Sequence, residues 1–253
     1  MNSSTLPPGG PLLLAPVVAH RGASGDAPEN TLGAIRLAAD QGARCIEIDV
    51  SISRDDVPFV HHDATLERCT NGAGRLCDHD AAELDRLQAD KGHSDWQGES
   101  LPRLSAVVEL CRQLNLGLNL EIKPAAGLEQ RTARAICTQL SATWPEELPF
   151  VFSSFSTAAL DTARECWSDA ARALLVGRVP ADWKERLSRH ACRNLHCAGG
   201  QLTAEDAGEI VAASVGLYCY TVNDPVRARE LLACGVHGVF TDHPGRLLAA
   251  LPA

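Results

Sequence analysis

Apolar residues recur along the chain in short runs that alternate with amphipathic stretches. From residue 17 onward, the runs rich in apolar and β-branched residues predict strands. They cover residues 17–20, 45–52, 57–62, 116–123, 149–155, 171–176, 194–197, 216–222 and 238–242. Residues 30–42, 101–114 and 224–235 carry apolar side chains at helical spacing, and Gly117 and Gly235 are expected to end the last two of these helices.

The alternation of strands and helices is typical of a parallel α/β fold, and it predicts a (β/α)8 TIM barrel. Nine strands are one too many for that barrel. The link from residues 45–52 to 57–62 is too short for a parallel crossover, so we expect an antiparallel hairpin turning at residues 54–56. If residue 53 pairs with residue 58, Asp49 lies opposite His62.

Residues 64–100 interrupt the alternation with glycines, many charges and Trp96, and a helix is expected near residues 78–88. We interpret them as a small subdomain inserted over the mouth of the barrel. No internal repeat is visible. Residues 1–253 are therefore predicted to form a single barrel domain.

Composition indicates a soluble globular protein, with 45% hydrophobic and 22% charged residues. The formal net charge of −9 argues against binding nucleic acid, because affinity for its backbone requires clustered Lys and Arg. An anionic substrate would need local positive charge from a metal ion or a few basic side chains.

The N-terminal apolar run lacks a basic segment and is interrupted by prolines, so it does not resemble a signal peptide. No stretch approaches the roughly 20 apolar residues of a membrane span. The ten cysteines are scattered without a CxxC pair, which favours buried thiols in a reducing compartment and a cytoplasmic location. The alternative is a metal site at Cys192 and Cys197, with His190 and His196 beside them.

Acidic residues stand within the apolar strands. Glu47 and Asp49 are two positions apart, so both project from one face, and they repel each other unless a proton or cation lies between them. Oxygen ligands suit Mg²⁺ or Ca²⁺ better than zinc, and Glu121 at another strand end could supply a third carboxylate. The alternative is a solvated strand face, or ion pairs with Arg44 and Lys123.

Histidines end two of the strands. His20 ends the first, and His61 and His62 end the hairpin. Two histidines beside an acidic cation site can share general base and general acid roles near neutral pH. Because adjacent strand residues face opposite ways, the hairpin register selects His62 and leaves His61 as a packing residue.

Arg21 and Lys123 are placed to meet an anion. Lys123 has an alternative role as a Schiff-base nucleophile, although Glu121 on the same face would keep it protonated. Phe155 is either an apolar wall of the substrate pocket or ordinary core.

Other polar residues leave alternatives open. Asn30 or Thr31 is expected to cap a helix, and Glu29 is either structural or part of the site. The polar groups of residues 220–223 and 241–242 either orient site residues or cap the following helices.

The chain resembles the glycerophosphodiester phosphodiesterases over about residues 17–244, especially the bacterial cytosolic members of the glycerol-phosphate uptake system. The resemblance rests on AHRGASGDAPENTLGAIRLAADQGARCIEIDVSISRDDVPFVHHDATLERCTNGAG and then, in order, on LNLEIKP, FSSF, YTVN and FTDHP. It implies a barrel with an insertion at residues 64–100. It also implies a small-molecule substrate, hydrolysed with a divalent cation to sn-glycerol 3-phosphate and an alcohol.

Carried over by position, the resemblance gives each candidate a role. It makes His20 and His62 the acid–base pair, has Arg21 and Lys123 contact the phosphate, and has one Mg²⁺ or Ca²⁺ held by Glu47, Asp49 and Glu121. Two departures stand out: Asp56 replaces a common glycine in the hairpin turn, and Tyr220 replaces a common tryptophan. The alternatives are a related lyase that stops at a cyclic phosphate and a non-catalytic phosphodiester-binding barrel. The oligomeric state is not specified.

Overall fold

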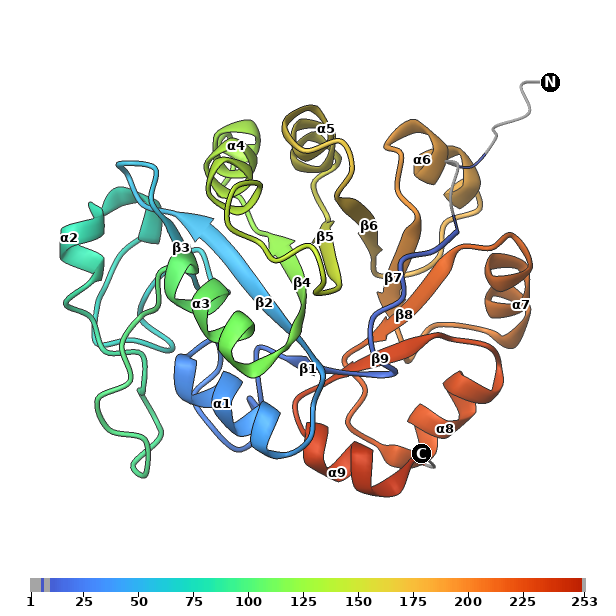
Figure 1. Cartoon of the computed structure of the whole chain (residues 1–253), viewed down its shortest axis with the longest axis horizontal. Coiled ribbons are helices and arrows are strands. Elements are labelled where there is room, and N and C mark those ends of the chain that lie inside the picture. Colours follow the sequence, from blue (N-terminus) through green and yellow to red (C-terminus); the bar gives the residue numbers. More distant parts are fainter. Residues whose placement is uncertain (1–5, 7–9, 252–253) are drawn as a thin grey trace.

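The computed structural model describes residue 6 and residues 10–251. Within them, eight parallel strands are β1 (Val17–His20), β2 (Cys45–Ile52), β4 (Gly117–Ile122), β5 (Phe150–Ser154), β6 (Ala171–Val176), β7 (Asn194–Ala198), β8 (Gly216–Tyr220) and β9 (Gly238–Thr241). Strand β1 pairs with both β2 and β9, which closes the sheet into a barrel (Figure 1). The predicted (β/α)8 barrel is confirmed.

Helices alternate with the parallel strands along the chain and surround the barrel (Figure 1). They are α1 (Leu32–Asp40), α3 (Leu104–Leu114), α4 (Glu129–Leu140), α5 (Thr157–Cys166), α6 (Trp183–Arg189), α7 (Ala204–Ala212), α8 (Pro225–Ala233) and α9 (Pro244–Ala250). The expected stop is confirmed for α8, after which Gly235 has a φ of 90°. It is wrong for α3, where Asn115 takes the left-handed conformation (φ 56°) and Gly117 opens β4.

Strand β3 (Pro58–Val60) pairs antiparallel with β2, which confirms the hairpin. Asp56 in its turn has a φ of 65°, the conformation that glycine adopts most easily. The predicted register is wrong by one residue, because Val50 pairs with Val60 and the His61 N–H donates to the Asp49 carbonyl (2.9 Å).

The two histidines after β3 nevertheless divide as predicted. The chain leaves β3 after Val60 and bends at His62, whose ring lines the cavity described below. His61 is buried, and its Nε2 lies 2.9 Å from the Thr65 carbonyl oxygen. The bend, not the cross-strand register, therefore directs His62 inward.

The segment between β3 and α3 carries little regular structure, namely η1 (Leu76–Asp78) and α2 (Ala81–Leu84). The helix expected near residues 78–88 is thus confined to one short turn. Buried Leu66, Leu76 and Leu84 form a small apolar cluster with Phe59 of β3. Figure 1 shows the segment beside the β2–β3 hairpin. That residues 64–100 form an inserted subdomain over the barrel mouth stays a prediction.

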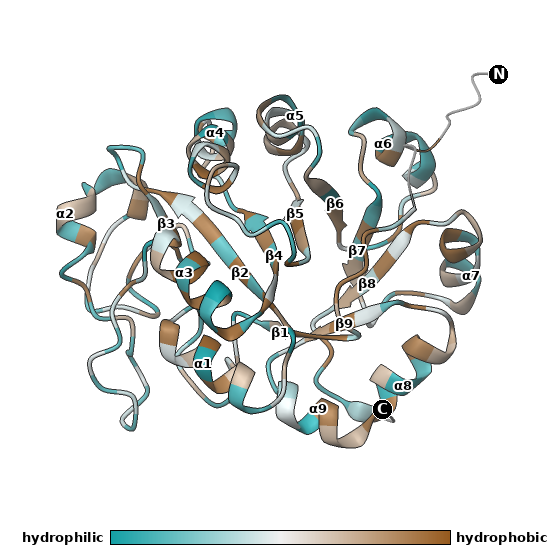
Figure 2. Cartoon of the chain, in the orientation of Figure 1, coloured by the Kyte–Doolittle hydropathy of each residue, from teal (hydrophilic) through white to brown (hydrophobic). Residues whose placement is uncertain are grey.

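Inward-facing residues divide the barrel into an apolar and a polar half. Val18, Val151, Tyr218 and Phe240 belong to one buried cluster inside it. Residues 12–15 close this end, since the Tyr218 hydroxyl donates to the Leu14 carbonyl (3.0 Å) and accepts from its N–H (2.7 Å). Figure 2 shows apolar residues along the strands and on the helix faces that cover them. Polar chemistry is left to the C-terminal strand ends, as is general for this fold.

Two further features bear on the sequence predictions. Across the described part of the chain, no helix is long and apolar enough to cross a membrane. The ten cysteines are free thiols, six of them buried, as expected from their scatter.

Candidate active site

The C-terminal strand ends surround a cavity of about 310 Å³. Seven of the residues predicted from the sequence line it: His20, Arg21, Glu47, His62, Glu121, Lys123 and Phe155. Asp49 is not part of the wall, but it is buried with 1% exposure and pairs with two of these residues. The structure therefore brings all the predicted site residues together.

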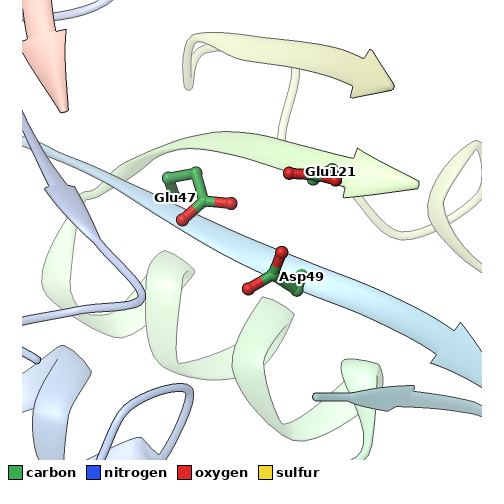
Figure 3. A group of neighbouring side chains, drawn as sticks. All are labelled: Glu47, Asp49 and Glu121. Atoms are coloured by element: carbon green, nitrogen blue, oxygen red, sulfur yellow. The ribbon is translucent and has the colours of Figure 1, made fainter. Parts of the chain in front are cut away.

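Three carboxylates gather beside this cavity. Asp49 on β2 lies opposite Glu121 on β4, and Glu47 precedes it on the same face of β2. One oxygen of each lies within 4.8 Å of the others, and Figure 3 shows the three side chains converging. Burial, followed by repulsion from Asp49, raises the pKa of Glu121 to about 7 and that of Glu47 well above its usual range. A cation between the three carboxylates would offset their mutual repulsion and favour their ionised forms.

Basic side chains compensate part of this negative charge. Lys123 Nζ lies 3.2 Å from oxygens of both Asp49 and Glu121, and Arg21 Nε lies 3.2 Å from Asp49. Although burial opposes ionisation, Lys123 and then Arg21 hold the pKa of Asp49 below its usual value. Glu47 accepts a hydrogen bond from the Arg21 backbone N–H (3.0 Å), and its Oε2 lies 4.0 Å from His20 Nε2. Three crowded oxygen donors fit a hard divalent cation.

The structure does not support a metal site at Cys192 and Cys197 or a Schiff-base role for Lys123. Among residues 6 and 10–251, the carboxylate trio is the one His/Cys/Asp/Glu group close enough to hold a metal ion. His190 instead pairs with Asp161 (2.9 Å), and Cys197 contacts Cys219. Burial works against the charge of Lys123, but Asp49 and Glu121 outweigh it and raise the lysine pKa, whereas a Schiff-base nucleophile needs the neutral amine.

A network of hydrogen bonds centred on Asp242 holds the His20 ring. Its Nδ1 lies 2.7 Å from Asp242, which accepts hydrogen bonds from Asn223 (2.7 Å) and Ser24 (3.1 Å). Burial opposes the charge of Asp242, but hydrogen bonds from His20 and Asn223 lower its pKa to about 2. With Nδ1 occupied, Nε2 faces the site, 4.0 Å from Glu47. Residues 220–223 and 241–242 therefore include groups that orient a site histidine.

His62 is held in the same way by a sequence neighbour. Its Nδ1 lies 2.7 Å from Asp63, which accepts two hydrogen bonds from Arg68. These hydrogen bonds, first from Arg68 and then from His62, hold the pKa of Asp63 well below its usual range. Burial lowers the pKa of His62, and Asp49 only partly offsets this effect. Glu29 joins Arg68 to Arg21 by further hydrogen bonds.

The loop after β1 fixes Arg21 and Asp49. Arg21 (φ 57°) and Gly22 (φ 78°) turn the chain through left-handed conformations, and a Cβ on Gly22 would lie 2.6 Å from the Ala34 carbonyl carbon. Thr31, not Asn30, caps α1 by accepting from the Ala34 N–H (3.1 Å). Asn30 instead donates to the Asp49 carboxylate (3.0 Å) and accepts from the Asp49 N–H (3.3 Å).

Sequence reasoning left Asp63, Arg68 and Ser24 out of the site. Adjacent His62 and Asp63, and the charged residue five positions later, were visible as polar residues after a strand end. The pairing of Ser24 with Asp242 has no local signal, because 218 positions separate them.

Two aromatic rings stand at the cavity rim and polar groups at its floor. Phe155 is 54% exposed and contacts Tyr220 edge to face, with ring centroids 6.1 Å apart, so it is wall rather than core. On the floor, Asn119 donates to Ser153 (2.8 Å), while its Oδ1 has no hydrogen-bond partner among the residues that the structure describes. His196 is fully buried there, and within the described part of the chain neither of its ring nitrogens has a hydrogen-bond partner.

Comparison with known proteins gives one consistent family. A profile of the glycerophosphoryl diester phosphodiesterase family matches residues 20–246. The chain is 31% identical over 236 residues to a putative glycerophosphodiester phosphodiesterase of Bacillus subtilis, covering 90% of this chain and 94% of the relative. It is also 31% identical over 239 residues to a glycerophosphodiester phosphodiesterase of Caldanaerobacter subterraneus, covering 92% and 96%.

Solved structures agree. A phosphodiesterase of Oleispira antarctica, in complex with the product sn-glycerol-3-phosphate, superposes with a TM-score of 0.91 at 39% identity, covering 94% of this chain and 96% of that one. A glycerophosphodiester phosphodiesterase of Agrobacterium tumefaciens gives a TM-score of 0.74 at 28% identity, covering 93% and 100%. The chain therefore belongs to the glycerophosphoryl diester phosphodiesterase family and is an enzyme of that activity.

Proposed function

We propose that the enzyme hydrolyses glycerophosphodiesters to sn-glycerol 3-phosphate and an alcohol, with a divalent cation and the His20–His62 pair. The observation that carries the proposal is the arrangement of one cavity. Two histidines, each with Nδ1 held by a carboxylate, face it beside three crowded carboxylates. The product named for the Oleispira structure supports the same substrate class.

Each group has a role that its surroundings support. Arg21 and Lys123 would bind the phosphate oxygens, since both line the cavity and keep their charge. One histidine takes the proton of the attacking oxygen at Nε2, and the other protonates the departing alcohol. Glu47, Asp49 and Glu121 would hold Mg²⁺ or Ca²⁺, which would stabilise the charge that develops on the phosphoryl oxygens. Phe155 would pack against the substrate.

The test is release of sn-glycerol 3-phosphate from glycerophosphocholine by purified protein with Mg²⁺ or Ca²⁺. His20→Ala and His62→Ala should each lower kcat by roughly 10²–10⁴-fold, because each removes one proton-transfer group. EDTA should abolish activity, and added cation should restore it. Full activity in either variant would remove that histidine from the mechanism, and activity in metal-free protein would contradict the cation site.

Product analysis separates the alternatives. A stable cyclic phosphate without sn-glycerol 3-phosphate would indicate a lyase, and binding without turnover would indicate a non-catalytic barrel. A cytoplasmic location is also part of the proposal and rests on the scattered free thiols.

A further inference from the structure

We infer that the two arms of the phosphodiester occupy separate cavities that meet at His62 and Lys123. The glycerol arm lies in the cavity of about 310 Å³ at the C-terminal strand ends, called the barrel cavity below. The departing alcohol lies in a smaller outer cavity of about 190 Å³. The inference rests on the proposed function and adds a binding site for the alcohol.

The outer cavity adjoins the first. His62 and Lys123 line both cavities, whereas His20 and Glu47 line only the barrel cavity. A phosphate at Lys123 therefore has space on two sides. A diester needs this arrangement, because its two ester oxygens leave the phosphorus in different directions.

The hydrogen-bonding atoms on the floor of the barrel cavity suit a ligand with several hydroxyl groups. Asn119 Oδ1 and both ring nitrogens of His196 are buried without a hydrogen-bond partner in residues 6 and 10–251, and Ser153 lies beside Asn119. Buried polar atoms of this kind cost free energy unless a ligand or water satisfies them. Glycerol hydroxyls both donate and accept hydrogen bonds, and glycerol is the part that all these diesters share.

The outer cavity suits a small aliphatic alcohol that varies between substrates. Its walls include Ser51, Pro124, Ala125 and the half-buried Cys77. Asp63 also lines it, but this carboxylate is already bound by His62 and Arg68. The site therefore selects mainly by shape and size.

This placement of the two arms assigns the base role to His20 and the acid role to His62 in the first step. The attacking oxygen forms its bond to phosphorus and passes its proton to His20, on the barrel side. The P–O bond to the alcohol breaks, and the alcohol oxygen takes a proton from His62, on the shared side. When the attacker is a glycerol hydroxyl, water then opens the cyclic phosphate with the two histidines in reversed roles.

The test fills the outer cavity and compares two leaving groups of different size. Ala125→Phe should lower kcat/KM for glycerophosphocholine by at least about tenfold, a modest steric penalty, while kcat/KM for the methyl diester of glycerol phosphate changes less than about twofold. Turnover of the methyl ester shows that the variant is folded. Inhibition by sn-glycerol 3-phosphate should be unchanged, because that product occupies the barrel cavity.

Two variants serve as comparisons. Ala126→Phe places the same ring on the exposed neighbouring residue, which does not line the outer cavity, and should leave both substrates unaffected. His196→Phe should impair both substrates by a common factor and weaken product inhibition. Equal losses on both substrates for Ala125→Phe, or no loss on glycerophosphocholine, would overturn the inference. If the unmodified enzyme released no sn-glycerol 3-phosphate from either ester, the proposed function itself would be wrong.

Discussion

Each site histidine has one ring nitrogen fixed by a carboxylate. Asp242 holds His20 and Asp63 holds His62, both at 2.7 Å. Such a contact favours the tautomer and ring orientation that direct Nε2 toward the cavity, and it would stabilise the imidazolium formed in the proposed proton transfer. In that mechanism the two carboxylates would orient the histidines without contacting the substrate.

At this scale, Asp242→Asn should lower kcat by about tenfold or more, and by no more than the ~10²–10⁴-fold that acid–base catalysis supplies. The amide keeps the shape of the side chain but loses the charge that orients His20. KM should change less than kcat, which steady-state kinetics would measure.

A matched control lies outside the site. Asp161 makes a comparable contact with His190 (2.9 Å), and neither residue is among those that line the barrel cavity. Asp161→Asn should leave kcat unchanged. Equal losses in the two variants would mean that Asp242 acts only through general stability.

At the scale of elements, the same left-handed turn is made by different residues. Gly235 makes it after α8, Asn115 makes it after α3, and Asp56 makes it in the hairpin. Glycine pays no Cβ penalty in this conformation, and Asn and Asp pay less than most residues. The backbone conformation at these turns is therefore more uniform than the residue type that adopts it.

Two glycines in neighbouring helical segments should respond oppositely to alanine. Gly235→Ala should lower the free energy of unfolding by about 1–2 kcal/mol, because φ is 90° there. Gly208→Ala, on the exposed face of α7 with open space around the new Cβ, should raise it by about 0.5–1 kcal/mol. Urea denaturation would measure both, and stabilisation by Gly235→Ala would contradict the assigned conformation.

At the scale of the whole molecule, we expect the carboxylate trio to make the stability of the fold depend on pH and on a bound cation. Burial and repulsion from Asp49 raise the pKa of both Glu47 and Glu121, so the folded chain holds more protons than the unfolded chain above their usual pKa of 4.5. The contribution of Glu121 to stability is therefore fully present below about 4.5 and is lost as pH rises through about 7, and that of Glu47 changes in the same direction. Asp242 acts oppositely: its contribution is lost only as pH falls through about 2.

The rise in Tm caused by Mg²⁺ or Ca²⁺ should consequently grow from pH 5 to pH 8. Cation binding favours the ionised carboxylates, and each kcal/mol gained corresponds to about 2–4 °C for a domain of this size. Calorimetry with and without EDTA would measure the difference. Glu121→Gln should weaken the pH dependence, and a Tm that ignores the cation at every pH would contradict the site.

Local patterns in the sequence determined the nine strands, the closed barrel and the inward carboxylates Glu47, Asp49 and Glu121. Hydrophobic periodicity and crossover length are properties of neighbouring residues, so they can be read without a fold. The hairpin register could not be read in this way, because pairing depends on where the turn closes, and the prediction was wrong by one residue.

Only the tertiary structure decided which groups meet. His20 and Asp242 are 222 positions apart and contact each other because β1 pairs with β9 when the barrel closes. His196 is likewise buried by packing across the barrel, and His62 lines two cavities whose other walls come from different parts of the chain. Contacts between residues that are close in the sequence thus follow from the order of the residues. Contacts between residues on opposite sides of the barrel depend on how the sheet closes.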